Sequence, residues 1–377
     1  MIESVKNVLI VGGGISGLTA AIALEKAGVK TEIVELKEEW NVYGVGIFQP
    51  PNALRALNEI GVAQKCIQQG YSFSGTAFCD VNGNQFTAPN NPKIDGYPGL
   101  NIISRRTLHE ILLEEAETCG VKIRMGVTVE EIDNQESHVN VKLTDGSTLT
   151  VDLVIGADGV HSKVRSLLFG KVEHEYVGQA CWRYELPRPK ELTNSVLYYG
   201  KKAKAGLVPM SEEKMYLLLM SAEPGNPRMP EDRMHELLRD RLQEFGGMVA
   251  EARELITDPT AVVYRPIFSF IMPSPWYKGR TLLVGDAAHA STPHLGQGAS
   301  IAIEDVIVLA ELLEKESDVQ LVLQAFMERR FERCRLLVDS SHQLVKWELM
   351  EWEGQSLDDV NPGEFSHFIF EKMNEAI

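Results

Sequence analysis

Residues 5–35 read VKNVLIVGGGISGLTAAIALEKAGVKTEIVE, and they carry the clearest indication of the fold. The apolar run at 5–11 is typical of a buried parallel strand. The Ala- and Leu-rich run after the glycines predicts a helix that ends near Gly28, and residues 30–35 predict a second strand. A strand–helix–strand unit of this length predicts the start of a right-handed parallel sheet.

The turn between the first strand and the helix has the spacing GxGxxG. Gly12 permits a tight turn, Gly14 lets the backbone approach a pyrophosphate, and Gly17 lets the helix pack on the strand. The positive end of the helix attracts phosphates, and Glu35 can accept hydrogen bonds from ribose hydroxyls. These parts together favour a dinucleotide site over a glycine turn without a ligand, but they do not separate FAD from NAD.

Composition and charge exclude several classes of protein. The net charge of −16 and the lack of a long basic run argue against a nucleic-acid partner. No apolar run approaches the roughly 18 residues of a membrane span, and the N-terminus lacks the basic region of a signal peptide. Five scattered cysteines without CxxC spacing are typical of reduced thiols. We therefore expect a cytoplasmic protein, with a monomer or a homodimer as its assembly.

The rest of the chain predicts a second lobe inserted into the first. Short strands of alternating polarity at 121–155, two of them joined by an Asp-Gly turn, predict an antiparallel flap on the first domain. Strands at 176–222 predict a separate antiparallel sheet. Residues 280–285 return to a buried-strand pattern and lead into a helix at 300–315, and the chain from Leu321 on reads as helical. Such a path suits a ligand site between two lobes.

Residues 285–298 read GDAAHASTPHLGQG and permit three interpretations. Asp286, His289 and His294 could bind a metal ion, but no HExxH motif or Cys/His cluster supplies further ligands. A hydrolase would need a nucleophile elbow, and no GxSxG occurs. As a flavin loop, the stretch places Asp286 at the end of a strand, where it can bind a ribityl hydroxyl, and the glycines open a helix whose positive end stabilises an anionic reduced flavin. The third interpretation is favoured, with no metal site and with both histidines in packing or hydrogen-bonding roles.

Three motifs in this order resemble the single-component FAD-dependent aromatic hydroxylases, the class A flavoprotein monooxygenases. They are GGGISG with Glu35, ADGVHSKVR at 157–165 and VGDAAHASTPHLGQGASIAIEDV at 284–306. The segment GVGIFQPPNALRALNEIG at 44–61 resembles the flavin-contacting loop of that family. The similarity extends from the N-terminus to about residue 340. It is nearest to the salicylate, 3-hydroxybenzoate and 6-hydroxynicotinate hydroxylases and the FAD-dependent urate hydroxylases.

The resemblance implies an α/β (α+β) fold like that of para-hydroxybenzoate hydroxylase. In that fold, a Rossmann-like FAD-binding domain is interleaved with an antiparallel-sheet substrate domain. The expected boundaries are 1–73, 99–173 and 274–330 for the FAD-binding domain, 74–98 and 174–273 for the substrate domain, and 331–377 for a C-terminal helical segment.

The resemblance also implies FAD and NAD(P)H as cofactors. Arg105 matches the arginine that reaches the cofactor, and Asp158 serves FAD and, indirectly, NAD(P)H, with an ordinary Asp-Gly turn as the alternative. Ser300 stands where the family often has an asparagine. The lack of a second GxGxxG agrees with transient binding of NAD(P)H. The predicted cofactor-binding residues are Gly12, Gly14, Ser16, Gly17, Glu35, Lys37, Gly46, Arg105, Val129, Asp158, Asp286, Gly296, Gln297, Gly298 and Ala299.

The predicted catalytic residues are Lys204, Tyr216 and Pro293. By resemblance to urate hydroxylases, Lys204 stands in place of an arginine and Tyr216 matches a tyrosine, while Pro293 positions a backbone carbonyl near the flavin. Since lysine cannot form the bidentate clamp of arginine, this difference argues against urate as the substrate. The alternatives are a solvated strand cation for Lys204 and a plain core aromatic for Tyr216.

The implied reaction has two halves. NAD(P)H reduces FAD, and the reduced flavin takes up O₂ as a C4a-hydroperoxide that hydroxylates a small electron-rich aromatic or N-heteroaromatic ring. Two alternatives remain open: a flavin-dependent reductase or dehydrogenase without oxygenation, and a non-catalytic binding protein on the same fold. The intact phosphate loop and the Gly285-Asp286 motif argue against a non-catalytic binding protein.

Overall fold

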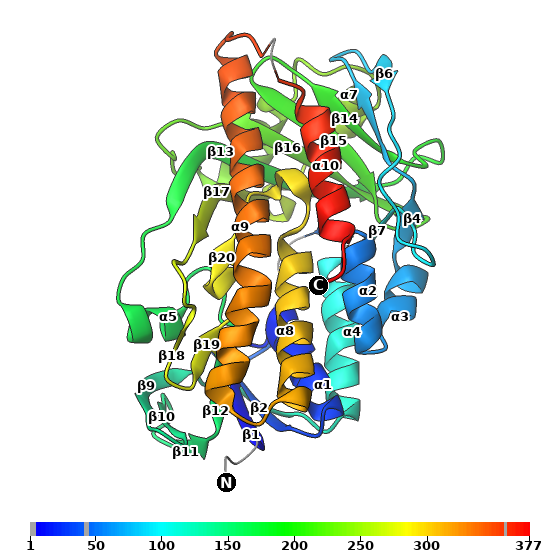
Figure 1. Cartoon of the computed structure of the whole chain (residues 1–377). Coiled ribbons are helices and arrows are strands. Elements are labelled where there is room, and N and C mark those ends of the chain that lie inside the picture. Colours follow the sequence, from blue (N-terminus) through cyan, green and yellow to red (C-terminus); the bar gives the residue numbers. More distant parts are fainter. Residues whose placement is uncertain (1–4, 41–44, 358–359) are drawn as a thin grey trace.

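Two large sheets surrounded by helices form the protein in a computed structural model that describes residues 5–40, 45–357 and 360–377 (Figure 1). The first sheet has the strand order β18-β19-β12-β1-β2-β8, and all its neighbours are parallel except β18 and β19. Its strands are β1 (Asn7–Val11), β2 (Lys30–Glu35), β8 (Lys122–Met125), β12 (Leu153–Gly156), β18 (Tyr277–Lys278) and β19 (Thr281–Leu283). The predicted parallel sheet is thus present.

The strand–helix–strand unit at the N-terminus forms as expected. α1 (Ile15–Lys26) follows the glycine turn and packs against α4 (Arg105–Thr118) and α8 (Gly298–Lys315) (Figure 1). A Cβ atom on Gly17 would lie 1.9 Å from the carbonyl oxygen of Gly12. Only glycine lets the helix approach the end of β1 this closely, which explains one of the three glycines of the motif.

The segment 121–155 is not one antiparallel flap, and that prediction was wrong at both its ends. β9 (Val129–Asn134), β10 (Val139–Leu143) and β11 (Thr148–Val151) do form a three-stranded antiparallel sheet. The flanking strands β8 and β12 instead pair in parallel with β2 and β1. Polarity patterns identify a strand but not its partner; all four residues of β12 are buried, as in a strand covered on both faces.

The second large sheet has the order β20-β17-β13-β16-β15-β14-β5-β6, and it is antiparallel except between β14 and β5. A small third sheet, β3-β7-β4, lies where the chain passes between the two. The strands of these sheets are β3 (Gly46–Gln49), β4 (Tyr71–Phe73), β5 (Thr76–Cys79), β6 (Gln85–Thr87), β7 (Leu100–Ser104), β13 (Glu175–Pro187), β14 (Ser195–Tyr199), β15 (Ala203–Pro209), β16 (Lys214–Ala222), β17 (Val263–Ile271) and β20 (His289–Ala290).

One long helix, α9 (Val319–Trp352), runs beside α8 and on past β17, β20 and β13 (Figure 1). It crosses residue 330 without a break, and α10 (Pro362–Asn374) packs against it. The other helices are α2 (Pro51–Glu59), α3 (Ala63–Gln69), α5 (Lys163–Phe169), α6 (Met234–Arg241), α7 (Gly247–Glu254) and the 3₁₀ turns η1 (Glu231–Arg233), η2 (Pro259–Ala261), η3 (Gly285–Ala287) and η4 (Pro293–Leu295).

The architecture agrees with the predicted α/β (α+β) class, a parallel sheet interleaved with an antiparallel one. The exact domain boundaries stay a prediction. All five cysteines carry free thiols. No helix within the described residues is both long enough and apolar enough to cross a membrane.

The close contact between Gly17 and Gly12 predicts that a side chain at residue 17 destabilises the protein. Gly17→Ser should lower the free energy of unfolding by about 1–3 kcal/mol, because the new side chain must push the helix off the strand. Urea unfolding followed by circular dichroism measures the loss. Gly14→Ser is the matched control, since a Cβ there meets no atom within 4 Å and serine caps helices well. Equal losses in both variants would contradict the packing role of Gly17.

Candidate functional site

The glycine turn leaves one side open at the N-terminus of α1. Gly12 has a φ of +106°, and a Cβ on it would lie 2.5 Å from the carbonyl oxygen of Ala157. Gly14 is the N-cap of α1, is exposed and has no side-chain cap. The first N–H groups of the helix are therefore open to an anionic ligand. Ser16 lies nearby, with its Oγ 2.6 Å from where a Cβ on Gly285 would be, so this turn contacts the 285–298 loop.

Glu35 holds the glycine turn in place. Its Oε2 accepts a hydrogen bond from the N–H of Gly13 at 2.8 Å, and its Oε1 accepts one from the N–H of Lys37 at 3.0 Å. This role was not expected from the sequence, and the predicted ribose contact stays a prediction. Val129 is fully buried at the start of β9, so it could contact a ligand only through its backbone.

The ADG motif offers one unsatisfied oxygen. Oδ2 of Asp158 caps α5 by accepting hydrogen bonds from the N–H groups of Lys163 at 2.6 Å and Val164 at 3.0 Å. Oδ1 is buried without a partner among the described residues, a condition that a hydroxyl donor from a ligand would relieve. Arg165, from the same motif, donates to the carbonyl oxygen of Ala287 at 2.8 Å and so ties this motif to the 285–298 loop.

Arg105, at the start of α4, and Asp286, just after β19, lie near each other. Both side chains are exposed, yet burial among the surrounding elements lowers the pKa of Arg105 and raises the pKa of Asp286. Asp286 offsets part of the effect on Arg105, so the two groups lie near each other. Gly46 lies at the same place: a Cβ on it would be 2.3 Å from the ring of Tyr216. The predicted stretch 44–61 begins at Gly44, which lies outside the described residues.

The glycines at the end of the 285–298 loop open α8. Gly296 has a φ of +62°, and Gln297 caps the helix without a side-chain hydrogen bond to its N–H groups. The N–H groups of Gly298 and Ala299 therefore stand at an uncapped, positive helix end. The buried Oγ of Ser300, one residue on, has no partner among the described residues. A ligand with carbonyl oxygens, such as a flavin ring, fits this end of the helix.

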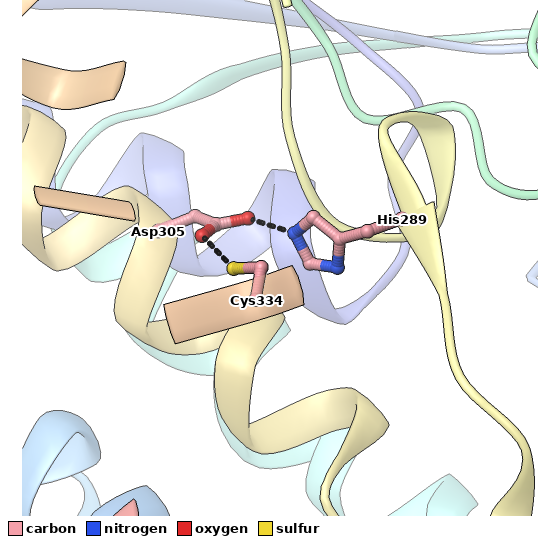
Figure 2. A group of neighbouring side chains, drawn as sticks. All are labelled: His289, Asp305 and Cys334. Atoms are coloured by element: carbon pink, nitrogen blue, oxygen red, sulfur yellow. Dashed lines mark hydrogen bonds and ion pairs between the residues drawn. The ribbon is translucent and has the colours of Figure 1, made fainter. Parts of the chain in front are cut away.

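His289 and His294 bind different carboxylates, so the 285–298 loop does not gather a metal site from Asp286 and its two histidines. Nε2 of His289 is 2.7 Å from Asp305, and Nε2 of His294 is 3.1 Å from Glu348. His289 and Asp305 do lie beside Cys334, and this trio has the ligand types of a metal site (Figure 2). The charges around this trio argue against a metal site.

Asp305 in that trio is already neutralised. Its carboxylate accepts hydrogen bonds from Nε of Arg330 at 2.8 Å and from the N–H of Gly285 at 3.0 Å. Burial would lower the pKa of His289, but Cys334 and Asp305 raise it to about 10. The guanidinium of Arg330, which lies against the carboxylate of Asp305, repels a metal ion. The trio is therefore part of a structural ion network.

The same network reaches the start of α8. Arg330 also donates to Glu304 at 2.9 Å, and Glu304 accepts a hydrogen bond from Asn52 of α2 at 2.9 Å. Asn52 in turn donates to the side chain of Gln297 at 3.0 Å. The side chain of Gln297 is thereby occupied, so this predicted cofactor residue could contact a ligand only through its backbone. Sequence reasoning missed Arg330, which lies in no motif, and it assigned no role to Asn52 within the 44–61 segment.

A large cavity lies between the second sheet and the C-terminal helices. It has a volume of about 960 Å³ and reaches the 293–296 segment of the loop, including Pro293. Its wall is mostly apolar and aromatic, with residues such as Phe48, Phe78, Val196, Leu218, Leu344 and Trp347. The carbonyl of Pro293 accepts the N–H of Gly296 at 3.1 Å, within the 3₁₀ turn.

Lys204 lines this cavity and is not a solvated strand cation. It is 8% exposed and forms an ion pair with Glu348 of α9. Lys204 of β15 and Met220 of β16 pair across the two strands, and both line the cavity. Tyr216 is 1% exposed and packs on Gly46 instead of lining the cavity. Glu348 was missed, because nothing in the charged C-terminal tail distinguishes it.

Comparison with known proteins identifies an FAD-binding family and relatives that cover most of the chain. The family described as "FAD binding domain" matches residues 6–341. YetM of Bacillus subtilis, provisionally assigned as an FAD-dependent monooxygenase, is 34% identical over 90% of this chain and 93% of its own. The 2-heptyl-3-hydroxy-4(1H)-quinolone synthase of Pseudomonas aeruginosa is 32% identical over 91% and 90%. HpxO of Klebsiella pneumoniae, solved with FAD and uric acid, superposes with a TM-score of 0.83 at 22% identity, over 98% of this chain and 96% of that one.

The open side of the glycine turn can be tested directly. Gly14→Ser should weaken FAD binding by at least about tenfold, because the new side chain fills the space through which a pyrophosphate reaches the helix end. Titration of the apoprotein with FAD, followed by flavin fluorescence, measures the affinity. The unfolding free energy of the apoprotein serves as the control and should not fall. Unchanged FAD affinity would place the pyrophosphate elsewhere.

The buried ion network around Asp305 predicts how the stability of the protein depends on pH. Burial would raise the pKa of Asp305, but His289 and Arg330 lower it from 3.8 to about 2. A lowered pKa stabilises the fold above pH 4, by about 2 kcal/mol, and this contribution disappears as the pH falls from 4 to 2. The unfolding free energy of each protein is measured at pH 7 and at pH 3. Its decrease between these two pH values should be about 1 kcal/mol smaller in Asp305→Asn than in the parent. Glu314→Gln, on an exposed part of the same helix, should lose as much as the parent. Equal losses in all three proteins would refute the role of Asp305.

Proposed function

The chain belongs to the FAD binding domain family of FAD-dependent monooxygenases, and from this premise we propose that it hydroxylates an electron-rich aromatic or N-heteroaromatic compound with NAD(P)H and O₂. The family, the enzyme class and the cofactor FAD predicted from the sequence are confirmed by the family match over residues 6–341 and by the relatives. The substrate and the choice between NADH and NADPH belong to the proposal.

One observation carries the proposal: the cavity reaches the loop that would hold the flavin ring. Its volume of about 960 Å³ lies at the upper end of the roughly 300–1,000 Å³ of pockets for drug-sized ligands. Its walls are largely apolar, with the polar side chains of Lys204, His294 and Glu348 in one place. These properties favour a substrate with a polar aromatic head and an extended apolar group. The quinolone synthase that resembles this chain is named for a heptyl-substituted ring of that kind.

The chain supplies binding and orientation for FAD, which when bound accepts hydride and activates O₂. In this proposal, Gly12 and Gly14 cradle the pyrophosphate and Asp286 holds the ribityl chain. The uncapped end of α8 at Gly298 would hold the flavin ring and would stabilise negative charge on it. Two of the predicted catalytic residues take positioning roles: Tyr216 supports the backbone at Gly46, and Pro293 shapes the loop at the cavity.

The other predictions from the sequence concern alternative functions, the cellular location, the oligomeric state and the binding partners of the enzyme. The two alternatives, a reductase without oxygenation and a non-catalytic binding protein, are disfavoured by the family match and by the monooxygenase relative. The predicted cytoplasmic location, the monomeric or homodimeric state and the lack of a nucleic-acid partner stay predictions.

A series of 4-hydroxyquinolines tests the proposal. The 2-heptyl compound should stimulate NAD(P)H oxidation at a concentration at least about tenfold lower than the 2-methyl compound, because each buried methylene contributes about 0.8 kcal/mol. Oxygen consumption and mass spectrometry of the products measure the coupling. Oxidation that yields only hydrogen peroxide would support the reductase, and no stimulation by either compound would contradict the proposed substrate class.

A further inference from the structure

Lys204 is the only lysine or arginine among the described residues that line the cavity. Its ammonium group pairs with Oε1 of Glu348, which reaches it from α9. The two side chains are 10% and 9% exposed, so the pair is largely withdrawn from water. A cation compensated in this way has little attraction left for an anionic ligand.

The carboxylate of Glu348 is held from its other side as well. Its Oε2 accepts a hydrogen bond from Nε2 of Gln179 at 2.9 Å and lies 3.1 Å from Nε2 of His294. Nδ1 of His294 lies 2.9 Å from the hydroxyl of Thr292. Burial would raise the pKa of Glu348, but Lys204 and His294 lower it to about 2. The carboxylate is therefore charged at neutral pH and fixed in its orientation.

The described residues in the rest of the cavity wall include no further lysine or arginine. Glu351 and Glu364 also line it, and the whole chain carries a net charge of −16. An anionic substrate would meet these carboxylates and a lysine that is already paired, and like charges brought together cost several kcal/mol. A neutral substrate avoids this cost. It can also accept a hydrogen bond from Lys204, whose ammonium has three donors, at a ring nitrogen or carbonyl oxygen.

We propose that Glu348 determines substrate specificity: by neutralising Lys204, it restricts the cavity to aromatic substrates without a negative charge. Gln179 and His294 are positioning residues that hold its carboxylate against the lysine. His294 belongs to the 285–298 loop, so the selection takes place beside the segment that would face the flavin. The proposal rests on the hydroxylase function proposed above for its biological meaning.

Two probes of matched shape test the charge preference: 3-hydroxybenzoate and 3-hydroxybenzamide. Equilibrium titration of the holoenzyme, followed by flavin absorbance, gives both affinities. Glu348→Gln keeps the size of the side chain and one acceptor oxygen but frees the charge of Lys204. This variant should bind 3-hydroxybenzoate at least about tenfold tighter than the parent does, with the affinity for 3-hydroxybenzamide changed less than about threefold.

Glu351→Gln is the matched control, because Glu351 lines the same cavity one helical turn further along α9 and has no hydrogen bond to Lys204. It should keep the preference of the parent. The double variant Lys204→Gln/Glu348→Gln, which carries neither charge, should lose the gain in 3-hydroxybenzoate affinity. A Glu348→Gln variant that gains no affinity for 3-hydroxybenzoate overturns the proposal.

If Glu348→Gln does not fold, the affinities of the parent holoenzyme test the proposal. Tighter binding of 3-hydroxybenzamide than of 3-hydroxybenzoate supports it, and equal affinities for the two compounds overturn it. If the parent binds neither, the double variant decides: 3-hydroxybenzoate binding by that uncharged pair overturns the proposal, and its continued exclusion supports it. Turnover does not enter these titrations. A failure of hydroxylation would contradict the proposed function without altering the charge preference.

Discussion

The fully buried guanidinium of Arg330 is the interaction on which the cofactor side of the protein depends. It bridges Asp305 and Glu304 at 2.8 and 2.9 Å, and all three side chains are excluded from solvent. Through Asp305 it fixes the backbone of Gly285, and through Glu304 it reaches Asn52 of α2. A buried charge without a partner is strongly destabilising, so this set must form together. Its formation places the 285–298 loop against the start of α8.

The same helix, α9, carries both Arg330 and Glu348. These residues are separated by five turns of 3.6 residues, so they lie on the same face of the helix, roughly 27 Å apart. One end of that face secures the loop that would hold the flavin, and the other end reaches the cavity through Lys204. A single rigid element thus sets both the position of the cofactor loop and the charge of the cavity. The loop itself joins the two through His289 and His294.

Much of the fold could be predicted from the sequence, and the errors have a common cause. The parallel unit at 5–35 was correct, because the period of apolar residues and the glycine spacing report on the local backbone. The flap at 121–155 was partly wrong, because strand pairing depends on residues far along the chain. Lys204, predicted as a catalytic residue, does line the cavity, but its ion-pair partner is 144 residues away.

The cofactor turn, the order of the motifs and the family could all be read from the sequence, since each is a property of neighbouring residues and their backbone angles. Gly12 is required by its φ of +106° and Gly17 by its contact with Gly12, both within one short segment. Only the tertiary structure decided that His289 and His294 serve two different carboxylates and that Lys204 is neutralised. These are electrostatic contacts between distant elements, and a charged residue in a polar helix carries no sequence signal of the partner that folding brings to it.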